Sequence, residues 1–207
     1  MTAEVRRVAV LGGTFDPVHA GHLAIVVAVR EAIGADEAWL LPARTPALRS
    51  EPVAPAPLRL AMLEAAVRGV PGVRVVDLEL RRPGISYTID TLAGLASADA
   101  GTQPWWILGA DAVRHIGEWH RSAELREAVH LAVVQRQGEP RFNDSEVRAL
   151  GLHPGRTVVL DIWPPAVSAS EVRARVAAGE AVAGLVPAAV AAIIAASGLY
   201  RSTPAVR

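Results

Sequence analysis

Apolar and polar positions along the chain predict strands that alternate with helices. Short apolar or alternating runs, typical of strands, cover 8–11, 37–41, 73–80, 105–108, 131–135 and 158–162. Helical periodicity separates these runs at 22–32, 58–68, 88–95, 170–178 and 187–197, with short helices near 113 and 124. Because strands interleaved with helices form βαβ units, the pattern predicts an α/β fold with a parallel sheet.

One stretch tests this interpretation. Residues 181–198 are 18 uncharged residues, which reaches the length of a membrane span. Pro187 fits the first turn of a helix, and Gly198 fits a C-terminal cap. We therefore expect a short buried helix over about 187–197 and no membrane partner. The proline-rich residues 45–57 predict a surface loop.

Composition narrows the function classes. The chain has 207 residues, 51% of them hydrophobic, enough to bury a core. Its 21 basic residues, all arginine, balance 21 acidic ones, so nothing favours a nucleic-acid binder. The chain contains no cysteine, which excludes disulfides and fits the cytoplasm, and its N-terminus lacks the apolar core of a signal peptide.

We expect a single domain over residues 1–207. Its core is expected to be a Rossmann-like open parallel sheet with helices on both faces. Residues from about 165 to 207 are expected to form a small helical C-terminal part. Ligands in such sheets bind beyond the carboxyl ends of the strands.

The segment VAVLGGTFDPVHAGHL, residues 8–23, places unusual residues at such a strand end. Gly12 and Gly13 would allow close approach of a ligand and unusual backbone dihedrals. A helix starting near His19 would point its positive end at the same place. His19 and His22, three residues apart, would share a face and donate to phosphate oxygens. The segment therefore predicts a polyphosphate cradle.

Other interpretations of this segment fit less well. A histidine pair is compatible with a metal site, but the cysteine and carboxylate partners usual for zinc are not nearby in the sequence. The segment is not the dinucleotide-binding G-x-G-x-x-G, and a P-loop requires a lysine that this chain lacks.

Two segments carry a family resemblance. GGTFDPVHAGH resembles the signature of the nucleotidyltransferase superfamily with the HxGH motif, which transfers a nucleotidyl group from ATP or CTP to a phosphate. VSASEVRARV, residues 167–176, is similar to the superfamily's Ile-Ser-Ser-Thr-x-Ile-Arg element, with matches at Ser168, Ser170 and Arg173. There a helix N-terminus and an arginine hold the triphosphate. Ser168 and Glu171 also fit a capping box, which is compatible with that role.

Further segments narrow the family. ISYTIDTL at 85–92, WWILGADAVRHIGEW at 105–119 and LVPAAVAAIIAASGLYR at 185–201 resemble the bacterial nicotinate-nucleotide adenylyltransferases. The resemblance implies transfer of AMP from ATP to nicotinate mononucleotide in NAD biosynthesis. The products are nicotinate adenine dinucleotide and pyrophosphate. It also implies Mg²⁺ bound with ATP, held mainly by substrate and water, with no metal site built by the protein.

The same resemblance implies the site residues. Contacts to ATP are expected from Gly12, Gly13, Thr14, Phe15, His19, Gly21, His22, Ser168, Ser170 and Arg173. Among these, His19, His22 and Arg173 would stabilise charge on the phosphates as it develops. Contacts to the mononucleotide are expected from Asp16, Arg49, Tyr87, Thr88, Gly109, Asp111 and Trp119. Trp119 would stack on the pyridine ring. The alternatives are a core aromatic for Trp119 and a helix N-cap for Thr88.

One stretch departs from the family. Where its members usually carry Pro-Pro-His-Lys or Pro-Pro-His-Arg, this chain has TPALR at 45–49. Leu48 replaces the histidine and Arg49 keeps the charge. We expect Arg49 to serve the mononucleotide, with an ordinary exposed arginine as the alternative.

Two other functions stay open at this point. The chain could be another adenylyltransferase of the superfamily, with nicotinamide mononucleotide or pantetheine phosphate as acceptor. It could also be a nucleotide-binding regulator without catalysis. The segment from Asp111 to Trp119 argues against pantetheine phosphate, and the retained His19, His22 and Arg173 argue against the regulator. A homo-oligomer is possible.

Overall fold

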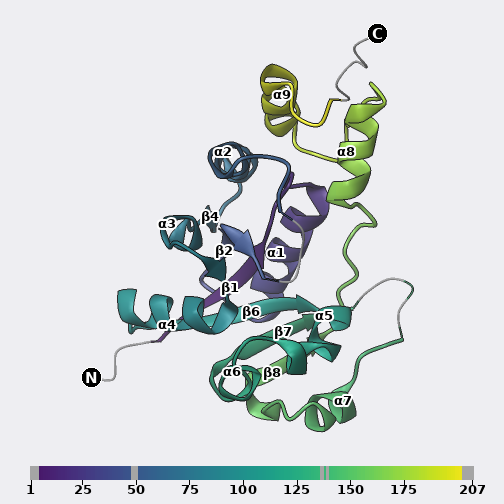
Figure 1. The fold of residues 1–207 in the computed structure, drawn as a ribbon. Coiled ribbons are helices and arrows are strands. Elements are labelled where there is room, and N and C mark those ends of the chain that lie inside the picture. Colours follow the sequence, from purple (N-terminus) through teal and green to yellow (C-terminus); the bar gives the residue numbers. More distant parts are fainter. Residues whose placement is uncertain (1–4, 48–50, 136–137, 139, 202–207) are drawn as a thin grey trace.

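The computed structural model describes residues 5–47, 51–135, 138 and 140–201. Its centre is a parallel sheet of six strands in the order β4-β2-β1-β6-β7-β8 (Figure 1). The strands are β1 (Arg6–Gly13), β2 (Glu37–Pro42), β4 (Val73–Val75), β6 (Thr102–Gly109), β7 (His130–Val134) and β8 (Thr157–Leu160). A separate pair joins β3 (Thr45–Pro46) to β5 (Ile85–Ser86).

Helices cover both faces of the sheet, as the sequence predicts. One face packs against α1 (Ala20–Ala32), α2 (Ala56–Val67), α8 (Ala169–Ala177) and α9 (Ala188–Ser197). The other packs against α3 (Leu78–Arg81), α4 (Thr88–Ala98), α5 (Ala110–Arg114), α6 (Ser122–Ala128) and α7 (Asp144–Ala149). There are also two 3₁₀ turns in the described residues. The turn η1 (Ile116–Glu118) lies between α5 and α6 in the chain, and η2 (Pro154–Arg156) lies between α7 and β8.

Strand β1 shows why the sequence gives two cores. Its side chains alternate between the two faces of the sheet. Ala9 lies in the core under α1 and α2, whereas Val8 and Val10 lie in the core under α4 and α5. Because both faces are buried, the strand reads as a continuous apolar run.

The strand order places the site. From β1 the chain moves outward through β2 to β4, then crosses to β6 and moves outward again through β7 to β8. The carboxyl ends of β1 and β6 therefore flank a topological switch point, where ligands of open α/β sheets bind. Gly13 ends β1 and Gly109 ends β6.

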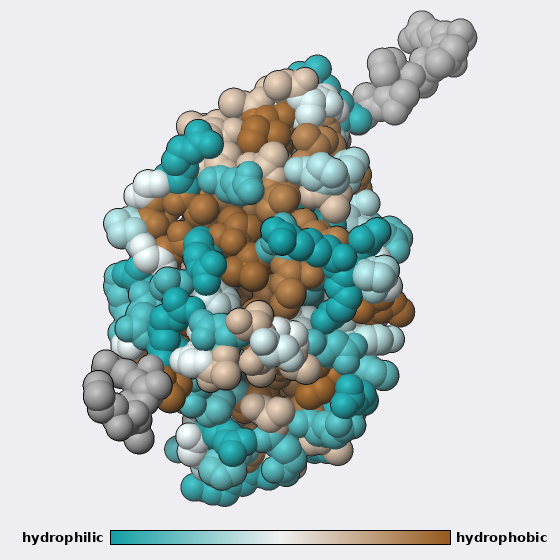
Figure 2. All heavy atoms as spheres, turned by 90° about the vertical axis from the view of Figure 1, so that its left-hand side faces the viewer, coloured by the Kyte–Doolittle hydropathy of each residue, from teal (hydrophilic) through white to brown (hydrophobic). Residues whose placement is uncertain are grey.

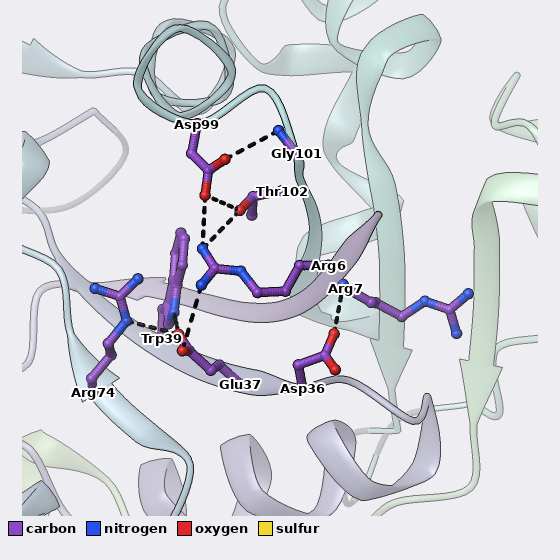
Figure 3. A network of polar contacts seen from close by, with 9 residues as sticks. All are labelled: Arg6, Arg7, Asp36, Glu37, Trp39, Arg74, Asp99, Gly101 and Thr102. Carbon is purple, nitrogen blue, oxygen red and sulfur yellow. Dashed lines mark hydrogen bonds and ion pairs between the residues drawn. The ribbon is translucent and has the colours of Figure 1, made fainter. Parts of the chain in front are cut away.

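The opposite, amino end of these strands is closed by a polar network (Figure 3). Arg6 donates to Asp99 at 2.8 Å, and Glu37 accepts from Trp39 Nε1 at 2.6 Å and from Arg74 at 2.8 Å. The indole of Trp39 lies between two guanidinium groups, with that of Arg74 4.3 Å from the ring centroid. The hydrogen bond from Trp39 and the charge of Arg74 lower the pKa of Glu37.

Two predictions about secondary structure need correction. Residues 73–80 do not form one strand, because β4 pairs only with β2 and the chain then turns into α3. That turn brings Glu79 inward, where the Thr91 hydroxyl lies 2.6 Å from its carboxylate. Residues 45–57 are not entirely loop, since β3 occupies Thr45–Pro46 and α2 begins at Ala56.

Helix α9 matches its predicted position but not its predicted burial. Val190 and Ile194 are buried, whereas Ala192 and Ala196 are exposed, so one face alone packs against α2. Figure 2 shows the side of the molecule that lies on the left in Figure 1, and apolar side chains gather in the upper half of that view. None of the helices in the described part of the chain is long and apolar enough to span a bilayer.

Candidate active site

The loop after β1 is shaped by close packing at its glycines. A Cβ on Gly12 would lie 2.8 Å from the ring of Trp106, and one on Gly13 would lie 3.3 Å from the ring of Phe15. Neither glycine has a positive φ; Phe15 does, at 52°. The prediction of unusual dihedrals at the two glycines is therefore wrong. They are small because aromatic rings cover them, and the left-handed residue is Phe15.

The two histidines of the motif lie against each other. Their ring centroids are 3.6 Å apart with the planes inclined by 25°, and the rings of Phe15 and His22 make a T-shaped contact with centroids 4.9 Å apart. The predicted shared face of His19 and His22 is thus confirmed. His22 Nδ1 accepts a hydrogen bond from the main-chain N–H of His19 at 3.2 Å. In neutral His22 this contact leaves the proton on Nε2, which is then a donor.

The start of α1 is crowded by the C-terminal part of the chain. A Cβ on Gly21 would lie 3.1 Å from His19 Nδ1 and 3.4 Å from the carbonyl of Pro165. The first main-chain N–H of the helix, at Ala20, donates to the carbonyl of Leu185 at 2.8 Å. Part of the helix N-terminus therefore bonds to protein. The Thr14 hydroxyl oxygen is buried and has no hydrogen-bond partner among the described residues, which fits a place for a ligand oxygen.

The second motif lies at the N-terminus of α8. Ser168 caps the helix, with its Oγ accepting from the N–H of Glu171 at 3.1 Å, which is the serine half of the predicted capping box. The Glu171 carboxylate pairs with Arg175 at 3.5 Å. Arg173 donates to Ser170 Oγ at 3.2 Å and to the main-chain carbonyl of Asp16 at 2.8 Å. The fold thus joins two motifs that lie 157 residues apart.

Asp16 has more partners inside the protein than the sequence suggests. Its side chain is buried, and its carboxylate accepts from the N–H groups of Val53 and Ala54 at 2.7 and 3.0 Å. The hydroxyl of Tyr200 donates to the same carboxylate at 2.7 Å. The structure therefore gives this carboxylate an anchoring role, and its predicted contact with the mononucleotide stays a prediction.

Arg59 is a second anchor, which the sequence analysis missed. It is 1% exposed and donates to the carbonyls of Thr14 and Ala43, both at 2.8 Å, and of Ala54 at 3.2 Å. Burial lowers the pKa of Arg59, and the carboxylate of Asp16 opposes this shift. The available signal was a single arginine within the apolar run LRLAML.

The predicted mononucleotide residues approach the switch point from β6 and α4. Asp111 lies in the first turn of α5, directly after β6. A Cβ on Gly109 would lie 2.4 Å from the Asp111 carboxylate, so only glycine admits this carboxylate position. Thr88 is not the N-cap of α4, because Tyr87 holds that position.

Tyr87 also connects α4 to the segment after η1. Its ring stacks on His120 with centroids 4.0 Å apart, and Arg121 donates to Asp90 at 3.2 Å. Trp119 is half-buried and packs against the core below, so the core interpretation accounts for part of its ring. Leu48 and Arg49 lie outside the described residues.

Comparisons with known proteins agree with this geometry. A family model described as cytidylyltransferase-like matches residues 10–175. The probable nicotinate-nucleotide adenylyltransferase of Bordetella pertussis is 40% identical over 198 residues, covering 95% of this chain and 99% of the relative. That of Pseudomonas putida strain GB-1 is 41% identical over 211 residues, covering 96% of each.

Solved structures share the fold. Plasmodium falciparum nicotinic acid mononucleotide adenylyltransferase complexed with NaAD superposes with a TM-score of 0.78 at 17% identity, covering 94% of this chain and 97% of that one. A putative nicotinate-nucleotide adenylyltransferase from Vibrio parahaemolyticus gives a TM-score of 0.67 at 16% identity, covering 96% of this chain and 97% of that one.

Proposed function

The chain belongs to the cytidylyltransferase-like family, with relatives of matching length among the nicotinate-nucleotide adenylyltransferases, and we propose that it is an enzyme with that activity. It transfers AMP from ATP to nicotinate mononucleotide and releases pyrophosphate. The observation that carries the proposal is that Arg173, from the second motif, bonds to Asp16 in the loop that leads from β1 to the stacked pair His19 and His22.

The reaction needs no nucleophile from the protein. A 5′-phosphate oxygen of the mononucleotide attacks the α-phosphorus of ATP in line. The bond from that phosphorus to the bridging oxygen breaks, and pyrophosphate leaves with the electron pair. Catalysis of such transfers consists mainly of positioning and charge stabilisation.

The residues in place suit those two tasks. The Nε2–H of His22 supplies a donor for a phosphate oxygen, and the stacked His19 holds the ring. The guanidinium of Arg173, fixed by Asp16 and Ser170, offers further N–H groups of fixed direction. Thr14 adds a hydroxyl at the same loop.

The predicted Mg²⁺ belongs to the substrate ATP in this proposal. Among residues 5–47, 51–135, 138 and 140–201, no three His, Cys, Asp or Glu side chains come together as a metal site. We propose that Mg²⁺ enters with ATP, bound to phosphate oxygens and water. No step of the mechanism runs through a metal held by the protein.

The proposed contacts to the mononucleotide on this side of the site come from Tyr87, Thr88, Asp111 and Trp119. Tyr87 and Thr88 lie where β5 leads into α4, Asp111 lies where β6 leads into α5, and Trp119 directly follows η1. We propose that residues 1–207 act as one unit, in which α8 brings the second motif to the first. The cytoplasmic location, the lack of nucleic-acid or membrane partners and a homo-oligomer stay predictions.

A pyrophosphate-release assay tests the proposal. Purified full-length protein is incubated with ATP and, in separate reactions, with nicotinate mononucleotide, nicotinamide mononucleotide or pantetheine phosphate. The proposal expects the highest kcat/KM with nicotinate mononucleotide. A higher value with pantetheine phosphate would assign the chain to another adenylyltransferase, and release with none of the acceptors would favour a regulator.

A further inference from the structure

Tyr200 lies near the end of the described chain, yet its side chain reaches the loop after β1. It is 8% exposed and belongs to the same core cluster as Phe15 and Ile194. Its hydroxyl donates to Asp16 Oδ1 at 2.7 Å, across 184 residues of sequence.

The backbone before Tyr200 is arranged to turn this ring inward. Helix α9 ends at Gly198, which has a left-handed φ of 66°. Tyr200 itself has a φ of 62°, a conformation that bulky side chains seldom adopt. A residue keeps such a conformation when its surroundings fix it, and here these are the core contacts and the bond to Asp16.

Asp16 transmits this contact to Arg173. The carboxylate of Asp16 accepts from Tyr200, and its main-chain carbonyl accepts from Arg173. The two bonds share one residue. The Tyr200 hydroxyl holds Asp16 together with the N–H groups of Val53 and Ala54, and the Asp16 carbonyl holds the guanidinium together with the hydroxyl of Ser170. Arg173 is half-buried, whereas the hydroxyl is enclosed, so only Arg173 can meet a ligand.

We propose that Tyr200 is a positioning residue for AMP transfer, which aims the Arg173 guanidinium at the triphosphate by fixing Asp16. This inference rests on the proposed function. The hydroxyl takes no part in the chemistry itself, since its proton is committed to Asp16. Burial, together with the Asp16 carboxylate, raises the pKa of Tyr200 well above its usual value, so the hydroxyl remains a donor at alkaline as well as at neutral pH.

A positioning role and a merely structural role predict different kinetics. Loss of fold stability lowers the amount of active enzyme, and this loss disappears at a temperature well below Tm. A misdirected Arg173 guanidinium lowers kcat at every temperature, because stabilisation of developing charge depends on the geometry of the donor. Displacing a group by about 1 Å can cost roughly 10²-fold in rate.

The test compares Tyr200→Phe with Ile194→Val in the full-length protein. Phenylalanine keeps the ring and removes only the hydroxyl. Ile194→Val trims the same core cluster without touching Asp16, and serves as the matched control for stability. We expect kcat of Tyr200→Phe to fall about tenfold, with both KM values within about threefold, while kcat of the control stays within about twofold. Equal effects of the two variants, or an unchanged kcat for Tyr200→Phe, would overturn the inference.

A second measurement uses the unsubstituted protein. The chain has two tyrosines, so labelling with 3-fluorotyrosine gives two ¹⁹F signals, and Tyr87→Phe identifies that of Tyr200. An ATP analogue with a methylene group in place of the oxygen between the α- and β-phosphorus cannot react, because the bond that breaks in the reaction is replaced by a stable P–C bond. Its binding should shift the Tyr200 signal as Arg173 engages its phosphates. A Tyr200 signal that stays in place at saturation would contradict the inference even if Tyr200→Phe fails to fold.

Failure of the proposed function is distinguishable from failure of this inference. Wild-type protein that releases no pyrophosphate with any acceptor contradicts the function. In that case the ¹⁹F signal still decides whether Tyr200 senses the triphosphate. Active wild-type protein with an unaltered Tyr200→Phe variant contradicts the inference alone.

Discussion

The imidazole rings of His19 and His22 are stacked 3.6 Å apart, and the main-chain N–H of one histidine fixes the ring of the other. The bond from the His19 N–H occupies His22 Nδ1, so Nε2 is the nitrogen that can donate. The motif therefore presents one donor of fixed direction, His22 Nε2–H, near the carboxyl end of β1. The buried ring of His19 packs against the ring that carries it.

His22→Ala should leave the fold intact and lower kcat by roughly 10²- to 10³-fold, because one preorganised donor to developing charge is lost. The measurement is steady-state pyrophosphate release, with circular dichroism to verify folding. His153→Ala is the control, since His153 is exposed at the amino end of β8 and should leave kcat unchanged. Near-normal turnover of a folded His22→Ala protein would remove His22 from the mechanism.

Arg173→Lys should lower kcat by about 10²-fold, although the charge is kept. Lysine cannot reach Asp16 and Ser170 at once and still present a fixed donor, because its ammonium is a single point charge. Arg175→Lys on the same helix is the matched control, since Arg175 is exposed and pairs with Glu171 at 3.5 Å. If both variants keep wild-type kcat, the guanidinium of Arg173 has no special role.

Nicotinate mononucleotide should be preferred over nicotinamide mononucleotide by about tenfold or more. In a site that binds a carboxylate with N–H donors, the amide NH₂ would face a donor and stay unsatisfied, at about 1–3 kcal/mol. The ratio of kcat/KM values, measured with saturating ATP, decides this. Equal values would mean that the pocket accepts both acceptors.

Arg59→Leu should lower the free energy of unfolding by at least about 3 kcal/mol, because it leaves several buried carbonyls without a donor. Urea denaturation measures the change. Arg68→Leu, an exposed position at the end of the same helix, should stay within about 0.5 kcal/mol of wild type. Comparable losses in both variants would show that the carbonyl contacts of Arg59 contribute little.

The free energy of unfolding should fall at alkaline pH because of Tyr200. Its folded-state pKa lies above that of an unfolded tyrosine, near 10, so above that pH the unfolded chain releases a proton that the folded chain keeps. The free energy of unfolding therefore falls as pH rises through about 10. Urea denaturation from about pH 8 to about pH 10.5 should show a smaller fall for Tyr200→Phe than for wild type or Ile194→Val. Parallel pH dependences would contradict the raised pKa.

The sequence by itself determined most of the main-sheet strands, most of the helices and the first motif, but not β3 or α3. Strands follow from short apolar runs such as 37–41, and helices follow from the 3.6-residue period of segments such as 22–32. The shared face of His19 and His22 was predictable because residues three apart lie on the same side of a helical turn, whereas the stacking of their rings is seen only in the structure. Ser168 as a cap is local in the same sense.

Only the tertiary structure decided which distant groups meet. Nothing near Asp16 in the sequence indicates that its carboxylate is held by Tyr200 and its carbonyl by Arg173. The burial of Arg59 is equally invisible, because a charged side chain goes inside only where several carbonyls converge on it. Local patterns fix which residues form an element, whereas buried polar groups find their partners only when the whole chain is packed. The sequence therefore identifies the loop of the candidate active site. The residues that hold this loop in place, Arg59, Arg173 and Tyr200, reach it only in the packed fold.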